Sequence, residues 1–240
     1  MAQSISPKDR IFCAIDTTDL DHAIDLASKL SGVIGGAKLG KEFFAAHGPQ
    51  GVQAVAKVGM PIFLDVKYHD IPNTVAGAIR AVTPTGLKIV NVHAAGGIEM
   101  MKRAGEAARE TAAKAGVDAP WVIAVTILTS MDQHDLDDVG LKGPIDERVV
   151  KLAELTQKAG LDGVVCSARE ITSVRAACGP DFKLITPGIR PAWAASNDQK
   201  RVVTPADAVA MGSDVLVIGR PITKADDPVD TARRIVAEVS

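Results

Sequence analysis

The stretch Pro61–Val66, which reads PIFLDV, is a short run of mostly apolar residues followed by a segment with a helical pattern. Seven further runs of this kind recur along the chain: Ile11–Ile15, Val33–Leu39, Leu87–His93, Trp121–Leu128, Gly163–Cys166, Phe182–Thr186 and Val215–Ile218. Eight strands that alternate with helices are what a (β/α)8 barrel requires. We therefore predict an α/β fold, a (β/α)8 TIM barrel that forms a single domain over residues 1–240. The alternative is an open, doubly wound sheet.

The segments between these runs contain signals at which helices begin. Thr18 and Asp21 resemble a capping box, and Ser167 with Glu170 has the full S-x-x-E pattern of one. Two further sites place a capping residue directly before a proline, which suits the first position of a helix: Thr204-Pro205 and Asp227-Pro228. We expect a helix to begin at each of these four places.

The composition is that of a folded globular protein, with 47% hydrophobic and 23% charged residues in a chain of 240. Aromatic residues make up only 3%, so the core must consist mainly of Ala, Val, Ile and Leu, which suits parallel strands covered by helices. The formal net charge of −2 lacks the basic excess of a general nucleic-acid-binding protein, so we expect no nucleic-acid partner.

Three cysteines, Cys13, Cys166 and Cys178, form no C-x-x-C pair. Cys13 and Cys166 sit in apolar runs, which indicates buried thiols and a reducing compartment. The first ten residues lack the apolar segment of a secretory signal, and no apolar run approaches the roughly 20 residues of a membrane span. We therefore expect a cytoplasmic protein that does not associate with membranes.

Two motifs look like binding sites for a nucleotide phosphate or a metal ion, but their residues do not fit such sites. Gly35–Lys41 matches the phosphate-binding pattern G-x-x-x-x-G-K, but the next residue is Glu42 where Ser or Thr would hold Mg²⁺, so the match is accidental. The acidic stretch Asp132–Asp138 fits no metal-ligand spacing. We interpret it as a solvated loop.

Polar residues are concentrated where the predicted strands end, which is where barrel enzymes place their active sites. They are Asp16, Lys38, Asp65, Lys67, His93, Thr129, Arg190 and Arg220. The strongest local signal is Asp65 with Lys67, because residues two apart on a strand point to the same side. An acid and an amine at the end of a buried strand are costly unless they pair or take part in chemistry. A structural ion pair is the alternative.

A second signal lies near the other end of the chain. Thr186–Arg190, which reads TPGIR, leaves the end of one predicted strand, and Gly219-Arg220 follows the next. The loops after strands 7 and 8 are where barrels commonly bind a phosphate. Gly219 allows the backbone to approach an anion, and Arg220 offers a two-pronged donor.

Together these signals resemble the orotidine 5′-phosphate decarboxylase family, in its bacterial monofunctional form, over nearly the whole chain. The matching stretches are Asp65–Thr74 (DVKYHDIPNT), Asn91–Gly97 (NVHAAGG), Ala124–Ser130 (AVTILTS), Leu161–Ser167 (LDGVVCS), Thr186–Arg190 (TPGIR), Asn197–Gln199 (NDQ) and Gly219–Lys224 (GRPITK).

The resemblance implies decarboxylation of orotidine 5′-phosphate to uridine 5′-phosphate, the last step of de novo pyrimidine synthesis, with no cofactor and no metal. Lys67 would protonate the ring carbon that loses CO₂, within an alternating charge array of Lys38, Asp65, Lys67 and Asp70 of the partner subunit in a homodimer. The remaining positions that the resemblance assigns to substrate binding are Asp16, Lys38, Ile71, Thr74 (across the dimer interface), Thr129, Arg190, Gln199, Gly219 and Arg220.

Two alternatives remain open. One is a metal-dependent sugar-phosphate decarboxylase or aldolase of the same superfamily, whose members resemble this chain at Asp65, Lys67 and Asp70. The other is a barrel that binds nucleotides without catalysis. The TPGIR and NDQ stretches argue against the first, and the retained charged residues argue against the second.

Overall fold

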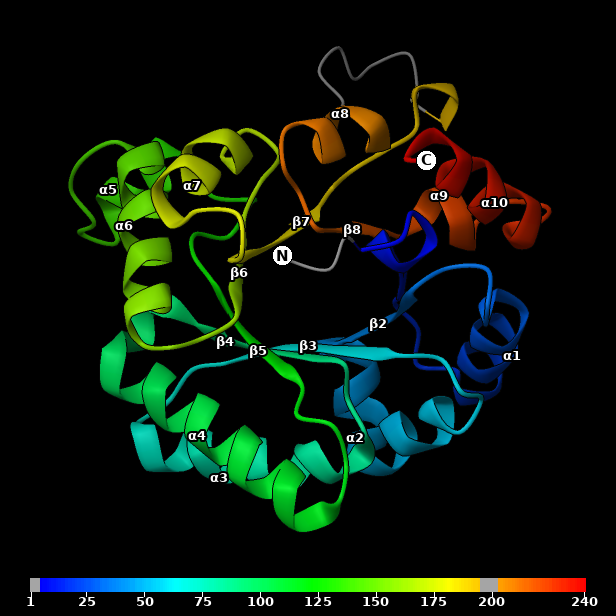
Figure 1. Ribbon diagram of the computed structural model, residues 1–240, viewed down its shortest axis with the longest axis horizontal. Coiled ribbons are helices and arrows are strands. Elements are labelled where there is room, and N and C mark those ends of the chain that lie inside the picture. The colour runs from blue at the N-terminus through cyan, green and yellow to red at the C-terminus, as the bar shows by residue number, and fades with distance from the viewer. Residues whose placement is uncertain (1–4, 195–202) are drawn as a thin grey trace.

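Eight parallel strands form a closed barrel in the computed structural model, which describes residues 5–194 and 203–240 (Figure 1). Each strand pairs with the next, and the last pairs with the first to close the ring. The strands are β1 (Ile11–Ile15), β2 (Gly36–Gly40), β3 (Ile62–Tyr68), β4 (Ile89–His93), β5 (Trp121–Val125), β6 (Gly163–Val165), β7 (Lys183–Pro187) and β8 (Val215–Ile218). The closed ring confirms the predicted (β/α)8 barrel and excludes the open sheet.

Helices surround the barrel as an outer ring (Figure 1). They are α1 (Leu20–Leu30), α2 (Lys41–Ala56), α3 (Pro72–Val82), α4 (Gly97–Ala115), α5 (Gln133–Asp138), α6 (Ile145–Lys158), α7 (Ile171–Cys178), α8 (Pro205–Ala210), α9 (Arg220–Thr223) and α10 (Pro228–Glu238). Short 3₁₀ turns add η1 (Lys8–Arg10), η2 (Thr83–Thr85), η3 (Ala94–Gly96) and η4 (Ala192–Ala194). Over the described ranges, no helix combines the length and apolar character needed to cross a membrane.

Strand β1 shows why the apolar runs lack a regular polar alternation. Ile11, Cys13 and Ile15 belong to the core between strands and helices, whereas Phe12 and Ala14 belong to the core inside the barrel. All five residues are buried, because both faces of the strand are covered. The sequence pattern thus reports a strand between two apolar layers.

The cysteines are free thiols, and all three are buried, as predicted for Cys13 and Cys166. Burial raises the pKa of both of these thiols to about 12. They therefore stay protonated and pack as small apolar side chains.

Some predicted strands extend beyond the observed ones. The run Trp121–Leu128 ends as a strand at Val125, and Ile127 and Leu128 line a cleft at the barrel mouth. The run Val33–Leu39 begins as a strand only at Gly36. Of the apolar residues outside these strand ends, Ile34 and Ile127 are buried, whereas Leu128 is exposed by 38%.

Two of the four predicted helix starts agree with the structure. The Thr204 hydroxyl accepts a hydrogen bond from the backbone N–H of Asp207, and the Asp227 carboxylate accepts from the second and third residues of α10. In both helices proline occupies the first turn, where no backbone donor is needed.

The other two predicted starts are wrong in detail. Helix α1 is capped by Asp19, whose side chain accepts from the N–H of His22, because Asp caps as well as Thr and lies nearer the first turn. Glu170 accepts from the N–H of Ser167 at 2.7 Å, but α7 begins only after this turn. The S-x-x-E pattern therefore makes half of a capping box ahead of the helix.

The stretch Asp132–Asp138 is not the predicted loop but contains the short helix α5. Asp132 and Asp135 form a reciprocal capping box, which accounts for two of the acidic residues. Nowhere in the described part of the chain do three His, Cys, Asp or Glu side chains gather in an arrangement suited to a metal ion.

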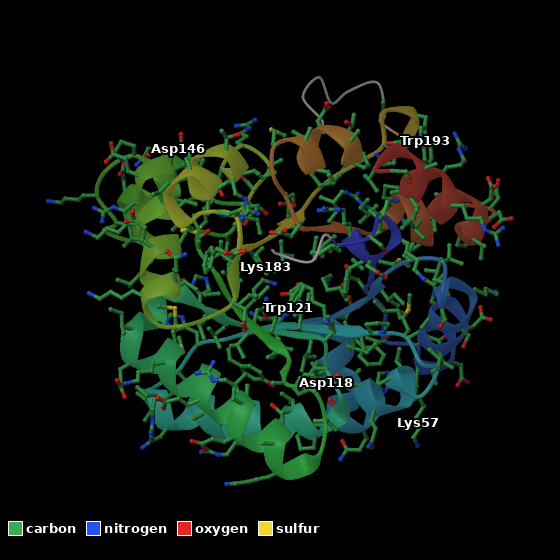
Figure 2. All side chains as sticks on the ribbon, in the orientation of Figure 1. Lys57, Asp118, Trp121, Asp146, Lys183 and Trp193 are labelled. Atoms are coloured by element: carbon green, nitrogen blue, oxygen red, sulfur yellow. The ribbon has the colours of Figure 1, made fainter. Side chains whose placement is uncertain are left out.

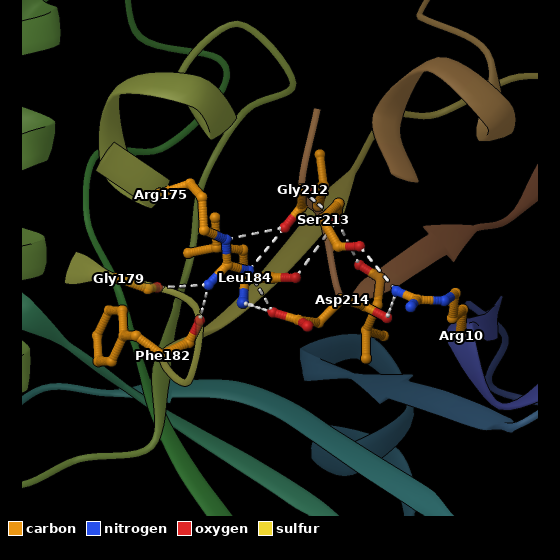
Figure 3. Close-up of polar contacts among 10 residues, drawn as sticks. Arg10, Arg175, Gly179, Phe182, Leu184, Gly212, Ser213 and Asp214 are labelled. Atoms are coloured by element: carbon orange, nitrogen blue, oxygen red, sulfur yellow. Dashed lines mark hydrogen bonds and ion pairs between the residues drawn. The ribbon is translucent and has the colours of Figure 1, made fainter. Parts of the chain in front are cut away.

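Arg175 joins the loops that precede β7 and β8 (Figure 3). Its guanidinium donates to the carbonyls of Gly179, Phe182 and Gly212, and it pairs with the Asp214 carboxylate at 2.6 Å. Asp214 in turn accepts from the N–H of Leu184 in β7. This cluster, which we call the Arg175 cluster, fixes the amino-terminal ends of two neighbouring strands.

Trp121 and Lys183, the first residues of β5 and β7, lie close to one another near the middle of the view in Figure 2. The ammonium groups of Lys88 and Lys183 stand 4.8 and 5.7 Å from the centre of the Trp121 ring. Such cation–π contacts support the same end of the barrel as the Arg175 cluster.

Candidate active site

The carboxyl ends of the strands open into a cleft of about 340 Å³. Its lining includes eight of the residues predicted from the sequence: Asp16, Lys38, Asp65, Lys67, Thr129, Arg190, Gly219 and Arg220. The apolar remainder includes Phe63, Val125, Val165, Ile185 and Val217, which continue the core inside the barrel. A polar rim around an apolar floor suits a small ligand with both a charged and an aromatic part.

Four of these residues form a chain of alternating charges at one end of the cleft. Lys38 Nζ lies 3.0 Å from Asp16 Oδ1 and 3.5 Å from Asp65 Oδ2. Lys67 Nζ donates to Asp65 Oδ1 at 2.7 Å. Each buried or half-buried charge therefore has an opposite charge beside it.

Asp65 is the centre of this array. Burial alone would raise the pKa of its carboxyl group, but the ammonium groups of Lys38 and Lys67 and the hydrogen bonds it accepts outweigh burial and hold the pKa below its ordinary value. The carboxylate therefore stays ionised. An ionised Asp65 orients the Lys67 ammonium group toward it.

Lys67 reaches this position in a way that the sequence does not reveal. The pairing of β3 with β4 shifts register between Leu64 and Tyr68, and Lys67 has a φ of +54°. It is the one non-glycine residue with a positive φ among those that the structure describes. The two side chains meet, as their spacing predicts, but a bulge, rather than a regular pleat, aims the lysine.

Asn91, which is not among the residues predicted from the sequence, contacts both Asp65 and Lys67. Its fully buried side chain accepts a hydrogen bond from the Lys67 N–H at 2.8 Å and donates one to Asp65 Oδ1 at 2.7 Å. A signal existed, since this asparagine interrupts the apolar run Leu87–His93. Such a residue needs partners when buried.

The opposite end of the cleft is formed by the loops after β7 and β8. Arg190, Gly219 and Arg220 line it. A side chain on Gly219 would place its Cβ only 3.3 Å from the Cβ of Ala14, and a glycine avoids this tight contact. Gln199 lies outside the described residues.

The segment that follows Arg190 is tied to the last helix. Trp193 donates from Nε1 to Glu238 at 2.5 Å, and the Arg234 guanidinium lies 4.1 Å from the centre of its ring. Figure 2 labels Trp193 beside α10. The Arg190 N–H also donates to the carbonyl of Val203.

Three residues that the resemblance assigns to the site do not line the cleft of their own chain. Asp70, Ile71 and Thr74 lie at the start of α3 and are exposed, Ile71 by 67%. The Asp70 carboxylate accepts from the N–H of Ile71 and does not cap α3. Among the residues that the structure describes, therefore, no hydrogen bond or ion pair joins Asp70 to Lys67.

His93, another of the polar residues at the strand ends, also lies away from the cleft lining. Its ring stacks on His69 with centroids 5.2 Å apart, and its buried Nδ1 has no hydrogen-bond partner in the described part of the chain. Burial, followed by the positive fields of His69, Lys41 and Lys67, lowers the pKa of His93. It is a packing residue behind the array.

Comparisons with known proteins agree on one family. The sequence profile described as "Orotidine 5'-phosphate decarboxylase / HUMPS family" matches residues 9–235. An orotidine 5′-phosphate decarboxylase from Paramagnetospirillum magneticum is 54% identical over 229 residues, which cover 95% of this chain and 97% of that protein. One from Rhodospirillum rubrum is 56% identical, with coverages of 95% and 93%. The crystal structure of the decarboxylase from Lactobacillus acidophilus is 34% identical, with a TM-score of 0.84 and coverages of 96% and 98%.

Proposed function

The chain belongs to the orotidine 5′-phosphate decarboxylase / HUMPS family and catalyses the decarboxylation of orotidine 5′-phosphate, and we propose that the reaction occurs in the described cleft without a cofactor, with Lys67 as the proton donor. The product would be uridine 5′-phosphate, which places the reaction at the last step of de novo pyrimidine synthesis. The observation that carries this proposal is the Lys67 ammonium group, which pairs with Asp65 at one end of a cleft whose other end presents Arg220.

The chemistry explains the need for an ammonium group. When the bond to the departing carboxylate breaks, CO₂ leaves and the electron pair stays on a ring carbon that has no conventional electron sink. Lys67 stabilises that charge and then transfers a proton to the carbon, and it regains a proton from solvent. Positioned charge and proton transfer are each established sources of rate enhancement.

The residues around the array have roles in binding. In this proposal Asp16 and Lys38 hold the ribose hydroxyl groups, and Thr129 lies beside the pyrimidine. Arg190, Gly219 and Arg220, with Gln199, bind the phosphate. The phosphate is remote from the reacting carbon, so its binding energy can be used to raise kcat.

The site is completed by a second subunit in this proposal. Asp70, Ile71 and Thr74 are exposed at the start of α3, where a two-fold partner could present them to the neighbouring cleft. Asp70 of the partner subunit would then add a negative charge beside Lys67 and extend the alternation. We also propose one decarboxylase domain over residues 1–240 and a cytoplasmic setting, which the three free thiols support.

Direct incubation with orotidine 5′-phosphate tests the function. We expect the absorbance change from orotidine to uridine 5′-phosphate, at the same rate with and without excess chelator. Loss of activity in chelator would instead favour the metal-dependent sugar-phosphate alternative. Tight binding of the nucleotide without turnover would favour a non-catalytic barrel.

A further inference from the structure

We infer that Asn91 is a positioning residue for the decarboxylation, because its side chain holds both the backbone and, through Asp65, the ammonium group of Lys67. This inference rests on the proposed role of Lys67. Asn91 does not line the cleft, and its side chain is fully buried. It therefore acts through the two residues that it contacts rather than on the substrate.

The contacts form a closed ring of three hydrogen bonds. The Lys67 N–H donates to Asn91 Oδ1 at 2.8 Å, Asn91 Nδ2 donates to Asp65 Oδ1 at 2.7 Å, and Lys67 Nζ donates to the same oxygen at 2.7 Å. The Asn91 amide thus holds the backbone of Lys67 directly. It holds the ammonium group indirectly, through the Asp65 carboxylate to which both side chains donate.

The orientation of the amide follows from its neighbours. Only the amide oxygen can accept from the Lys67 N–H, and only the amide nitrogen can donate to the Asp65 carboxylate. The reversed amide would place two donors together and two oxygens together. Among side chains of this size, an amide is the one that serves both partners at neutral pH.

The ring lies where the backbone most needs support. Between the register pairs Leu64–Val90 and Tyr68–Val92 the ladder of β3 and β4 is interrupted. Lys67, with its φ of +54°, sits inside that interruption, and its N–H donates to the Asn91 side chain. A left-handed backbone is unfavourable for a residue with a side chain and persists where its surroundings fix it. Asn91 supplies that constraint.

Asn91→Asp separates a positioning role from a packing role. The variant keeps the shape, but it can donate to Asp65 only when its new carboxyl group is protonated, and two facing carboxylates raise the pKa of one of them. We expect the ratio of its kcat to the wild-type kcat to be highest at low pH and to fall at least about tenfold as pH rises, while KM stays within about threefold.

Asn91→Leu removes both hydrogen bonds at every pH. One of these bonds is to the charged Asp65 carboxylate, and losing one such bond costs about one to two powers of ten. We therefore expect kcat to fall about 10- to 150-fold or more, with little pH dependence in the ratio to wild type. Thr126→Val is the matched control. Thr126 is also fully buried, just beyond the end of β5, and its hydroxyl donates to the carbonyl of Val165 rather than to a member of the array. This control should lower the melting temperature and leave kcat unchanged.

The inference is overturned if Asn91→Leu lowers only the melting temperature, as Thr126→Val should, or if the pH profile of Asn91→Asp is parallel to that of wild type. Failure of Asn91→Asp to fold at any pH would also overturn it, because Asn91 would then serve the fold. If only Asn91→Leu does not fold, the pH dependence of kcat in Asn91→Asp decides between a positioning role and a packing role. A wild-type protein that does not convert orotidine 5′-phosphate contradicts the proposed function instead, and so the two failures are distinguishable.

Discussion

Two carboxylate–cation pairs of almost equal geometry lie at opposite ends of the barrel. Asp65 and Lys67 are 2.7 Å apart, with exposed side-chain fractions of 13% and 26%, and Asp214 and Arg175 are 2.6 Å apart, with fractions of 15% and 20%. Neither distance nor burial distinguishes them. The two pairs differ in how many N–H groups of the cation have no hydrogen-bond partner among the described residues.

Every N–H of the Arg175 guanidinium is used. Its donors meet the carbonyls of Gly179, Phe182 and Gly212 as well as Asp214, and all of these groups belong to the Arg175 cluster (Figure 3). Lys67 Nζ, in contrast, donates to Asp65 alone among the described residues and lines the cleft. A cation with all its donors paired stabilises loops, whereas one with donors left over faces a ligand.

Lys67→Ala should have the largest effect on activity. We expect decarboxylation to be abolished, while the protein still folds and binds the nucleotide, because the ammonium group that remains beside Asp65, that of Lys38, is shared with Asp16. Steady-state turnover and nucleotide titration measure both. Near-wild-type turnover in this variant would mean that the Asp65–Lys67 pair, like the Asp214–Arg175 pair, has no role in the reaction.

A matched variant, Lys67→Gly, isolates the backbone. It also removes the ammonium group and should be equally inactive, but glycine tolerates the φ of +54°. It should therefore be about 1 kcal/mol more stable to urea than Lys67→Ala. Equal stability would mean that the backbone at this position is not strained.

Mixing inactive subunits tests whether the catalytic pair depends on a neighbour. If Asp70 acts in trans, a mixed dimer of Lys67→Ala and Asp70→Ala subunits has one site with both lesions and one with neither. Activity should then return toward half of the wild-type value per mixed dimer. If Asp70 acts within its own chain, every site keeps a lesion and no mixture is active.

Arg175→Met should show the opposite profile to Lys67→Ala. It leaves the Asp214 carboxylate and several carbonyls without their donor, and breaking such a pair costs about 3–5 kcal/mol. We expect a loss of that size in the free energy of unfolding, with kcat per folded molecule unchanged. Urea denaturation and turnover are the two measurements.

Lys29→Met is the control for that change. Lys29 and Asp25 are equally close, at 2.6 Å, but both side chains are more than half exposed. Solvent screens such a pair, so the loss should stay below about 1 kcal/mol. A similar loss in both variants would show that the carbonyl contacts of Arg175 contribute little.

Arg220→Ala should affect binding at the far end of the cleft more moderately. Removal of a charge-assisted contact to phosphate costs about 1.5–3 kcal/mol, or roughly 10- to 150-fold in kcat/KM. Turnover of orotidine, which lacks the phosphate, should be reduced much less by the same substitution. Equal losses on both substrates would argue against a phosphate site here.

The smallest effect is expected at His93, which packs behind the array. Its pKa in the folded protein lies below the ordinary 6.5, so the unfolded chain takes up a proton first as pH falls. Stability should therefore decline as pH drops below about 6.5. His93→Phe keeps a stacked ring without the titration and should flatten that decline in thermal melts. An unchanged slope would assign the decline to other groups.

The eight strands and the eight predicted residues that line the cleft could be located from local sequence patterns. The apolar runs located all eight strands because each is buried on both faces, as β1 illustrates. The eight cleft residues could be predicted because parallel strands present their carboxyl ends to the same mouth. Helix starts were less certain, since Asp19 competes with Thr18 for the same cap.

By itself the sequence determined the barrel and the side chains at its carboxyl mouth, because periodicity and strand ends are properties of neighbouring residues. Only the tertiary structure decided which Asp–cation pair faces a cleft and which is structural. Arg175 finds Gly212 and Asp214 at 37 and 39 positions along the chain, and Asn91 finds Lys67 and Asp65 at 24 and 26. The number of donors left for a ligand depends on such distant partners, and strand spacing does not contain them.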